Sequence, residues 1–220
     1  MAHTPPSLRP NLNVEDSVSW IPHPSGIFTI GLAWNAIRKR YPIQPWRKII
    51  WTGNAVPRWS FILWLAVLQR LSTKDRLNSW DLHLDETCSL YNLATETHQH
   101  LFFECSFSTV VWQHLVNKNM VLDMPSNLVE VLDWYGVQVK GKSLRCMSLT
   151  CSLATAVYRL WRERNCRIFQ GIAMGHDQVM KGIADGVRDF LSTRRNVKQS
   201  LKNQDLCRQW GLPNRIFFPV

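Results

Sequence analysis

The sequence predicts a mainly α-helical protein, an irregular helical bundle with one cysteine- and histidine-rich loop and few short strands. Apolar residues recur at steps of three and four along most of the chain, which is the spacing of one helix face. The candidates for strands are two short segments, residues 17–21 and 26–30. A composition of 45% hydrophobic and 19% charged residues is that of a globular protein with a core, which excludes a disordered chain.

The helical periodicity predicts helices over residues 28–41, 57–71, 74–80, 106–115, 143–168 and 179–191, with a short helix or turn over residues 46–51. Pro57 suits the first turn of the helix over residues 57–71 because its missing N–H would have no partner there. That helix is apolar on nearly every face, so we expect Trp59 and Trp64 to pack in the core.

Two of the later helices carry more specific expectations. A helix capped by Ser106 or Ser108 should bury one apolar stripe, formed by Phe107, Val110, Val111 and Leu115. In the longest helix, Glu163 is expected to pair with Arg159 and Arg167 on the exposed side.

The helices and the charge pattern divide the chain into five parts. These are an irregular, proline-rich lead-in (1–25), a first domain (26–118), a connector (119–142), a basic helical region (143–195) and a tail (196–220). Residues 140–220 hold fifteen Lys and Arg against five Asp and Glu, so the net charge of +10 comes from this part of the chain. It is a candidate surface for a polyanion, although scattered basic residues also serve simply to solvate helix faces.

The sequence also limits the location of the protein. The longest apolar run, residues 61–68, is far shorter than the roughly 18 residues of a membrane span, so we expect no membrane insertion. The N-terminus lacks the pattern of a secretory signal, and the six cysteines are therefore expected in a reducing, intracellular compartment as thiols or metal ligands.

The segment from residue 88 to residue 105 has the spacing of metal ligands. Cys88, His100 and Cys105 form the arrangement C-x11-H-x4-C, and zinc prefers such thiolate and imidazole donors. A four-ligand knuckle would need a cysteine three residues after Cys88, where this chain has Tyr91. A phenol gives up its proton at neutral pH far less readily than a thiol, so we expect zinc binding at this site to be weakened or lost.

Two further histidines are alternatives for the missing fourth ligand. His98 and His100 would point about 200° apart if both are helical, which argues against a shared ion. His83 is the second alternative and stays open at this point. The remaining cysteines have no C-x2-C spacing and are expected to be buried thiols; they are Cys146, Cys151, Cys166 and Cys207.

These motifs resemble the zinc-binding domain that follows the reverse transcriptase in plant non-LTR retrotransposons. The segment ETHQHLFFEC, residues 96–105, is similar to the second half of its metal motif, E-T-x-x-H-L-F-F-x-C. Upstream, GIFTIGLAW and PRWSFILWLAVLQRLSTKDRLNSW are similar to two further family motifs, and WRERNCRIF, residues 161–169, is similar to a helix downstream of the domain. The resemblance therefore covers about residues 20–170.

The resemblance implies that Cys88, His100 and Cys105 are zinc ligands in a degenerate knuckle, residues 88–105, and that Tyr91 departs from the pattern at the fourth ligand. It also implies RNA or DNA as the partner and access to the nucleus. Candidate phosphate contacts lie in the basic helix, at Arg162, Arg164 and Arg167.

Three function classes follow from these observations. The first is a non-enzymatic, retrotransposon-derived module that binds nucleic acid weakly. The alternative is a metal-free helical scaffold or protein-interaction domain without that activity. An enzyme such as a metal-dependent nuclease ranks last, because the carboxylates occur only as isolated pairs such as Asp81 with Asp85. We therefore expect no catalytic residues.

Overall fold

The structure is a computed structural model that describes residues 18–52, 55–122 and 125–219. The chain divides into two compact units, residues 1–43 and residues 44–220. Most of the expected lead-in, and residue 17 of the first expected strand, lie outside the described residues. Each unit is described separately below.

The described part of the first unit contains one helix, α1 (Ile30–Ile37). The side chain of Thr29 caps it by accepting a hydrogen bond from the Leu32 amide at 3.1 Å. The helix is shorter than the expected span of 28–41 and ends at Ile37, because the backbone of Arg38 is already extended. Residues 18–30 form no strand, so both strand expectations are wrong for the described residues.

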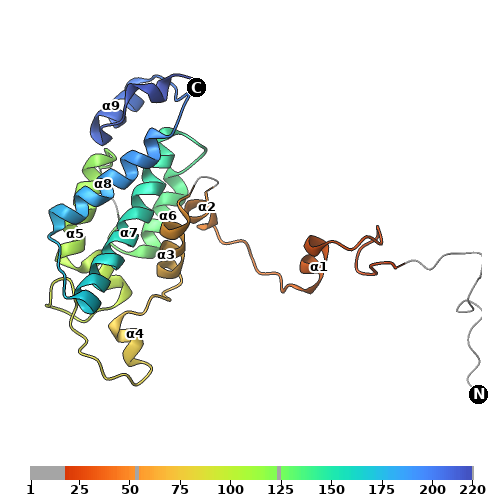
Figure 1. The fold of residues 1–220 in the computed structure, drawn as a ribbon, viewed down its shortest axis with the longest axis horizontal. Helices are drawn as coiled ribbons and strands as arrows, with labels where there is room; N and C mark the ends of the chain where they lie inside the picture. The colour runs from red at the N-terminus through yellow and green to blue at the C-terminus, as the bar shows by residue number, and fades with distance from the viewer. Residues whose placement is uncertain (1–17, 53–54, 123–124, 220) are drawn as a thin grey trace, which may run out of the picture. The chain divides into compact units, whose positions relative to one another are not determined.

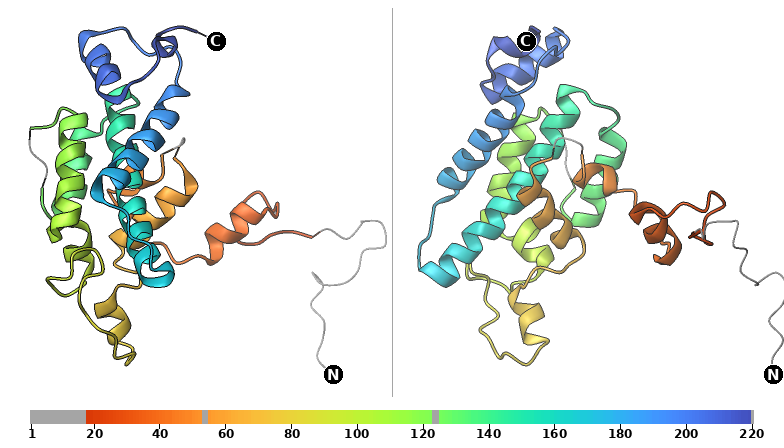
Figure 2. Two further views of the ribbon diagram at one scale, coloured as in Figure 1. Left: turned by 60° about the vertical axis from the view of Figure 1, so that its left-hand side comes forward. Right: turned by 45° about the vertical axis from the view of Figure 1, so that its right-hand side comes forward.

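The second unit is a bundle of helices around α7 (Leu144–Gln170), which runs through its middle (Figure 1). Helices α3 (Pro57–Val67), α5 (Ser106–Lys118), α6 (Leu128–Gln138) and α8 (His176–Ser192) all pack against α7 (Figure 2). The shorter elements are α2 (Arg47–Ile50), α4 (Lys74–Asn78), the π-helix η2 (His100–Glu104), α9 (Leu201–Trp210) and the 3-10 helix η3 (Asn214–Phe217). The prediction of a mainly α-helical protein is confirmed.

The long apolar helices form where their sequence pattern predicts them. Pro57 occupies the first turn of α3, and Trp59 is buried while Trp64 is partly buried against the core. Ser143 caps α7 by accepting the Cys146 amide at 3.2 Å, and Gly171 ends the helix in the left-handed conformation. Within the described residues, the only strand-like pairing is one isolated bridge between Thr87 and Thr95.

Several local expectations need correction. Helix α5 begins after Cys105, so neither Ser106 nor Ser108 is its N-cap, and Val110 is exposed instead of lying on the buried stripe. Helix α6 lies inside the expected connector, where Asn127 caps it by accepting the Glu130 amide at 2.9 Å. In the described part of the chain, no helix combines the length and the apolar character needed to cross a bilayer.

Candidate metal centre

A closed loop places the first cysteine of the motif. The bridge between Thr87 and Thr95 joins the two ends of the loop, and the Cys88 amide donates to the Ala94 carbonyl at 2.7 Å. Inside the loop, the Asn92 amide donates to the Cys88 carbonyl at 2.8 Å. Cys88 itself is completely buried. The loop therefore holds the Cys88 sulfur beneath it, away from solvent.

The π-helix η2 places the other two residues of the motif. In an α-helix, residues five positions apart point about 140° away from one another. In η2 the Cys105 amide donates to the His100 carbonyl at 2.7 Å, an i→i+5 bond that closes a wider turn. This wider turn accommodates the H-x4-C spacing and brings His100 and Cys105 toward the same point.

Helix α5 supplies the hydrogen bonds that such a turn otherwise lacks. The Ser108 hydroxyl donates to the Leu101 carbonyl at 2.5 Å, and the Trp112 indole N–H donates to the Phe102 carbonyl. The rings of Phe103 and Trp112 stack with centroids 5.5 Å apart. These contacts are buried, so they fix the π-turn to α5 and thereby orient the two ligand residues.

Cys88, His100 and Cys105 form a compact cluster, in which one ligand atom from each lies within 4.8 Å of the others. The two sulfurs are 3.9 Å apart. Two thiolates on one tetrahedral zinc, each at about 2.3 Å from the ion, would lie about 3.8 Å apart. The Nε2 atom of His100 is buried without a hydrogen-bond partner. These three residues therefore fit a zinc ion.

Backbone amides surround both sulfurs. The hydrogen bond between the two thiols lowers the pKa of Cys88, and the amides of Leu90 and Tyr91 lower it further against the effect of burial. The same thiol hydrogen bond and burial raise the pKa of Cys105, although the amides of Phe107 and Ser108 point at its sulfur. Amide donors of this kind stabilise thiolates, which are the metal-binding form of cysteine.

The alternatives for the fourth ligand do not join the cluster. The Nε2 atom of His98 accepts the Leu71 amide at 3.1 Å, and its Nδ1 atom bonds the Thr73 hydroxyl at 3.2 Å. Both ring nitrogens of His98 are thus engaged, which confirms that His98 and His100 face different groups. His83 is exposed and does not belong to the cluster. The Tyr91 side chain is 52% exposed, although its amide contacts the Cys88 sulfur.

Comparison with known families agrees with this geometry. Residues 28–112 match the family model described as zinc-binding in reverse transcriptase. This segment is a reverse transcriptase zinc-binding domain. No curated protein and no solved structure matches the chain. The family match supports a retrotransposon-derived zinc-binding domain. The matched residues include the complete cluster and end within α5, and α6 to α9 lie beyond the match.

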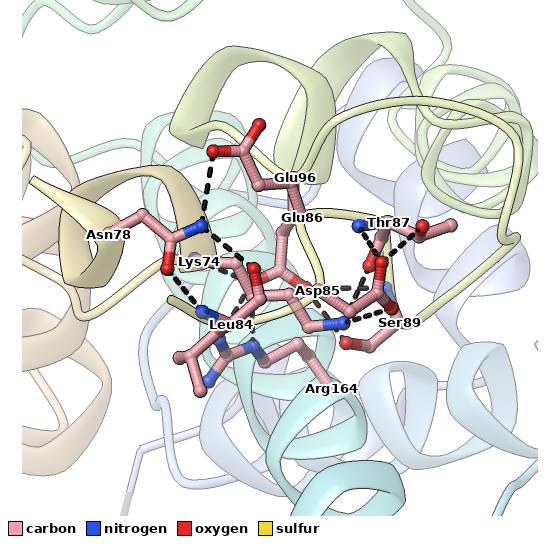
Figure 3. Close-up of polar contacts among 9 residues, drawn as sticks. All are labelled: Lys74, Asn78, Leu84, Asp85, Glu86, Thr87, Ser89, Glu96 and Arg164. Atoms are coloured by element: carbon pink, nitrogen blue, oxygen red, sulfur yellow. Dashed lines mark hydrogen bonds and ion pairs between the residues drawn. The ribbon is translucent and has the colours of Figure 1, made fainter. Parts of the chain in front are cut away.

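Glu96 anchors the loop that carries Cys88 to the rest of the bundle (Figure 3). One carboxylate oxygen accepts two hydrogen bonds from the Arg164 guanidinium, at 2.9 and 2.6 Å, and one from the Lys74 amide at 3.1 Å. The other oxygen accepts the amide and the hydroxyl of Ser89. Sequence reasoning did not assign this role to Glu96, although the residue is part of the metal motif.

Lys74 and Asn78 of α4 hold residues 84–87, which lead into the same loop (Figure 3). The Lys74 ammonium donates to the Thr87 carbonyl at 2.7 Å and lies 3.6 Å from the Asp85 carboxylate. The Asn78 side chain bonds both the amide and the carbonyl of Leu84. The loop is therefore supported from α4 on one side and from α7 on the other.

The three arginines expected at a nucleic-acid surface differ in their surroundings. Arg164 is buried in its ion pair with Glu96, so it is not free to contact phosphate. The Arg167 guanidinium donates to the Leu90 carbonyl at 2.6 Å and pairs with Glu163 at 2.7 Å. Both side chains are used inside the protein, which argues against their role at phosphate. Arg162 is exposed.

The expected surface position of Glu163 is wrong. Glu163 is completely buried and pairs with Arg167, while its Oε1 atom also accepts the Met174 amide at 2.8 Å. The Arg167 guanidinium donates in addition to the Met174 carbonyl at 3.0 Å. This buried pair ties the segment after α7 to the loop that carries Cys88.

Proposed function

We propose that the protein is a non-enzymatic nucleic-acid-binding module in which Cys88, His100 and Cys105 hold a structural zinc ion weakly. One observation carries the metal part. The buried sulfurs of Cys88 and Cys105 lie 3.9 Å apart in a cluster with His100, and the Nε2 atom of His100 is buried without a hydrogen-bond partner. Buried polar atoms in native proteins normally have partners, and a metal ion would supply one here.

The missing fourth protein ligand is the reason to propose weak binding. Structural zinc sites are almost always closed by four protein ligands, and this chain offers three with Tyr91 at the fourth position. Zinc would connect the loop of Cys88 with the π-turn of His100 and Cys105, so its role here is to stabilise the fold. The chain keeps hydrogen-bonded supports for both parts, Glu96 for the loop and Trp112 for the turn.

The charge distribution supports nucleic acid as the partner. The excess of basic over acidic residues lies in the C-terminal part of the chain, next to the zinc-binding domain in the sequence. When such a basic surface binds nucleic acid, it releases counterions from the phosphates, so the affinity should fall steeply with salt. Electrophoretic mobility shift over a salt series tests this part, and the lack of a complex at low salt would contradict it.

The non-enzymatic part of the proposal rests on how the nearby carboxylates are used. Asp85 accepts hydrogen bonds from the hydroxyl and the amide of Thr87, at 2.6 and 3.0 Å, which lower the pKa of this carboxyl. Glu86 accepts a hydrogen bond from Asn78, and Glu96 is buried against Arg164. These groups shape the loop, which is a structural use and not the arrangement of a general base.

Zinc stoichiometry tests the metal part directly. Purified protein should carry clearly less than one equivalent of zinc by elemental analysis, and Tyr91→Cys should carry close to one equivalent because it completes the four-ligand set. Leu93→Cys is the matched control, since it adds an exposed thiol to the same loop two residues further on. His100→Ala in the Tyr91→Cys background should lose the gain.

Two results would contradict this view of the metal site. Full zinc occupancy in both the wild-type protein and Tyr91→Cys would show that Tyr91 does not weaken zinc binding. No zinc in either protein would favour the metal-free scaffold, provided that circular dichroism shows both to be folded.

A further inference from the structure

We propose that a groove between α3 and α7 is the site that binds nucleic acid, and that it takes an unpaired strand. The inference rests on the proposed nucleic-acid function and gives it a location. The groove is lined by one residue of α3, Ile62, and by a face of α7 that includes Tyr158, Trp161, Arg162, Cys166 and Phe169. We call this the aromatic groove.

Aromatic rings supply the faces on which bases can stack. Tyr158, Trp161 and Phe169 recur at steps of three and eight residues, which places them on one side of α7. Tyr158 and Trp161 are partly buried against the core, so their rings are held in place. Phe169 is 77% exposed, so its ring is accessible to a ligand. Stacking of bases on aromatic side chains is the common mode of binding unpaired strands.

One arginine lines the aromatic groove, and two more lie near it. The Arg58 guanidinium lies over the Tyr158 ring, 5.8 Å from its centroid, and Arg162 lines the groove. Arg159 packs against Gly182 of α8, where an added Cβ would lie 3.2 Å from its Cζ atom. Its Nε atom is buried without a partner. None of the ion pairs found among residues 18–52, 55–122 and 125–219 involves these three arginines.

The arginines are close enough to act on one another. Burial lowers the pKa of Arg159 first, and the neighbouring charge of Arg162 and then that of Arg58 lower it further. The acidic group that faces Arg159 is Asp185 of α8, and this carboxylate already pairs with Arg188 at 2.8 Å. Local positive charge therefore exceeds local negative charge, which favours an anionic ligand.

The combination of charge and aromatic faces selects the class of ligand. Phosphates can pair with guanidinium groups, and only unpaired bases expose faces that can stack on Phe169 and Trp161. In a duplex the bases are stacked on one another, so it would meet the arginines without using the rings. An acidic peptide would likewise use the charge alone. We therefore commit to single-stranded RNA or DNA.

Fluorescence anisotropy with labelled oligonucleotides tests the site, using the full chain, a single strand and the corresponding duplex. Phe169→Ser should weaken single-strand binding by about 5-fold or more, the range of one lost stacking contact. Arg162→Ala should lower the slope of log affinity against log salt by about 0.7, the loss of one phosphate contact. Phe218→Ser and Lys202→Ala, which are exposed and lie near the C-terminus, are the matched controls and should bind like the wild-type protein.

Protection of Cys166 gives a second, direct readout. Cys166 lines the aromatic groove and is the one cysteine of the six that is not buried. A bound single strand should slow its alkylation, as followed by mass spectrometry of the peptide that contains it. An acidic peptide at the same charge concentration should not protect it.

The outcomes separate this inference from the proposed function. If the wild-type protein binds no nucleic acid at low salt, both the proposed function and the aromatic groove as its site are contradicted. If it binds, but Phe169→Ser and Arg162→Ala bind like the controls and Cys166 stays reactive, the aromatic groove is not the site while nucleic-acid binding stands. Tighter binding of the duplex with no effect of Phe169→Ser also overturns the groove.

Discussion

Glu96 and Arg164 form an ion pair that is almost completely excluded from solvent, with side chains 0% and 3% exposed. Charges in such a position are costly to bury, and they are tolerated when each hydrogen bond of the pair is made. Glu96 accepts hydrogen bonds from Arg164, Lys74 and Ser89, and thereby connects α7, α4 and the loop that carries Cys88. The pair therefore contributes to the position of the loop as well as to stability.

Arg164→Met should lower the free energy of unfolding by about 3–5 kcal/mol, because it leaves the Glu96 carboxylate buried without its counter-charge. Adding Glu96→Gln should cost less than a second full penalty, since the uncompensated charge is then removed. Urea unfolding measures both. Arg208→Met is the control, because Arg208 pairs with Asp205 at the surface and should change stability by about 1 kcal/mol or less. If Arg164→Met lowers the free energy of unfolding no more than the control does, the Glu96–Arg164 pair does not stabilise the fold.

At single residues, the sequence predicted the metal cluster better than it predicted the arginines. Cys88, His100 and Cys105 follow a spacing that only a few types of site require, and the structure brings them together. A charged residue on a helix is assumed to face water unless something contradicts this. Burial of Arg164 depends on Glu96, 68 positions away, and a helical periodicity contains no information about that contact.

Helices α7 and α8 approach each other closely where α8 carries two glycines, Gly182 and Gly186. A Cβ at position 186 would lie 3.2 Å from the ring of Trp59 and 3.5 Å from the Thr155 side chain. Trp59 is buried among α3, α7 and α8, so its ring has little room to move. The missing side chain thus allows three helices to pack together at this point.

Gly186→Ala should destabilise the protein by about 1–3 kcal/mol, because crowding against Trp59 outweighs the better helix propensity of alanine. Gly136→Ala in α6 is the matched control. An added Cβ there meets nothing within 4 Å, so this variant should gain up to about 1 kcal/mol. Thermal and urea unfolding of both variants measure the difference. An equal gain in stability for the two variants would contradict close packing at Gly186.

At the scale of elements, periodicity predicted the long helices and missed those that depend on their surroundings. The expected helix over residues 143–168 agrees closely with α7, because a cap and a long apolar stripe define it. Helix α6 has a short apolar stripe, Val131, Leu132 and Tyr135, which did not stand out within the connector. The π-helix η2 could not be predicted, since its wide turn depends on hydrogen bonds from Ser108 and Trp112 of the next helix.

In the whole molecule, the segment that matches the zinc-binding family does not coincide with a compact unit. The match covers residues 28–112, whereas the second unit covers residues 44–220. The buried core of that unit combines α3 and α5 with α7 and α8, and α7 also supplies the arginine that holds Glu96. In the first unit, α1 has no buried residue. The folding unit should therefore be residues 44–220.

A fragment of residues 44–220 should unfold cooperatively and within about 1 kcal/mol of the full chain, because the buried hydrophobic core of the described residues begins at Ile49. A fragment of residues 28–112 should show no cooperative transition, since it lacks α7 and α8, the helices against which α3 and α5 pack. Calorimetry and urea titration followed by circular dichroism compare the three chains. Cooperative unfolding of the shorter fragment would show that the zinc-binding domain folds without α7, and a large loss of stability in the longer one would assign residues 1–43 a part in the fold.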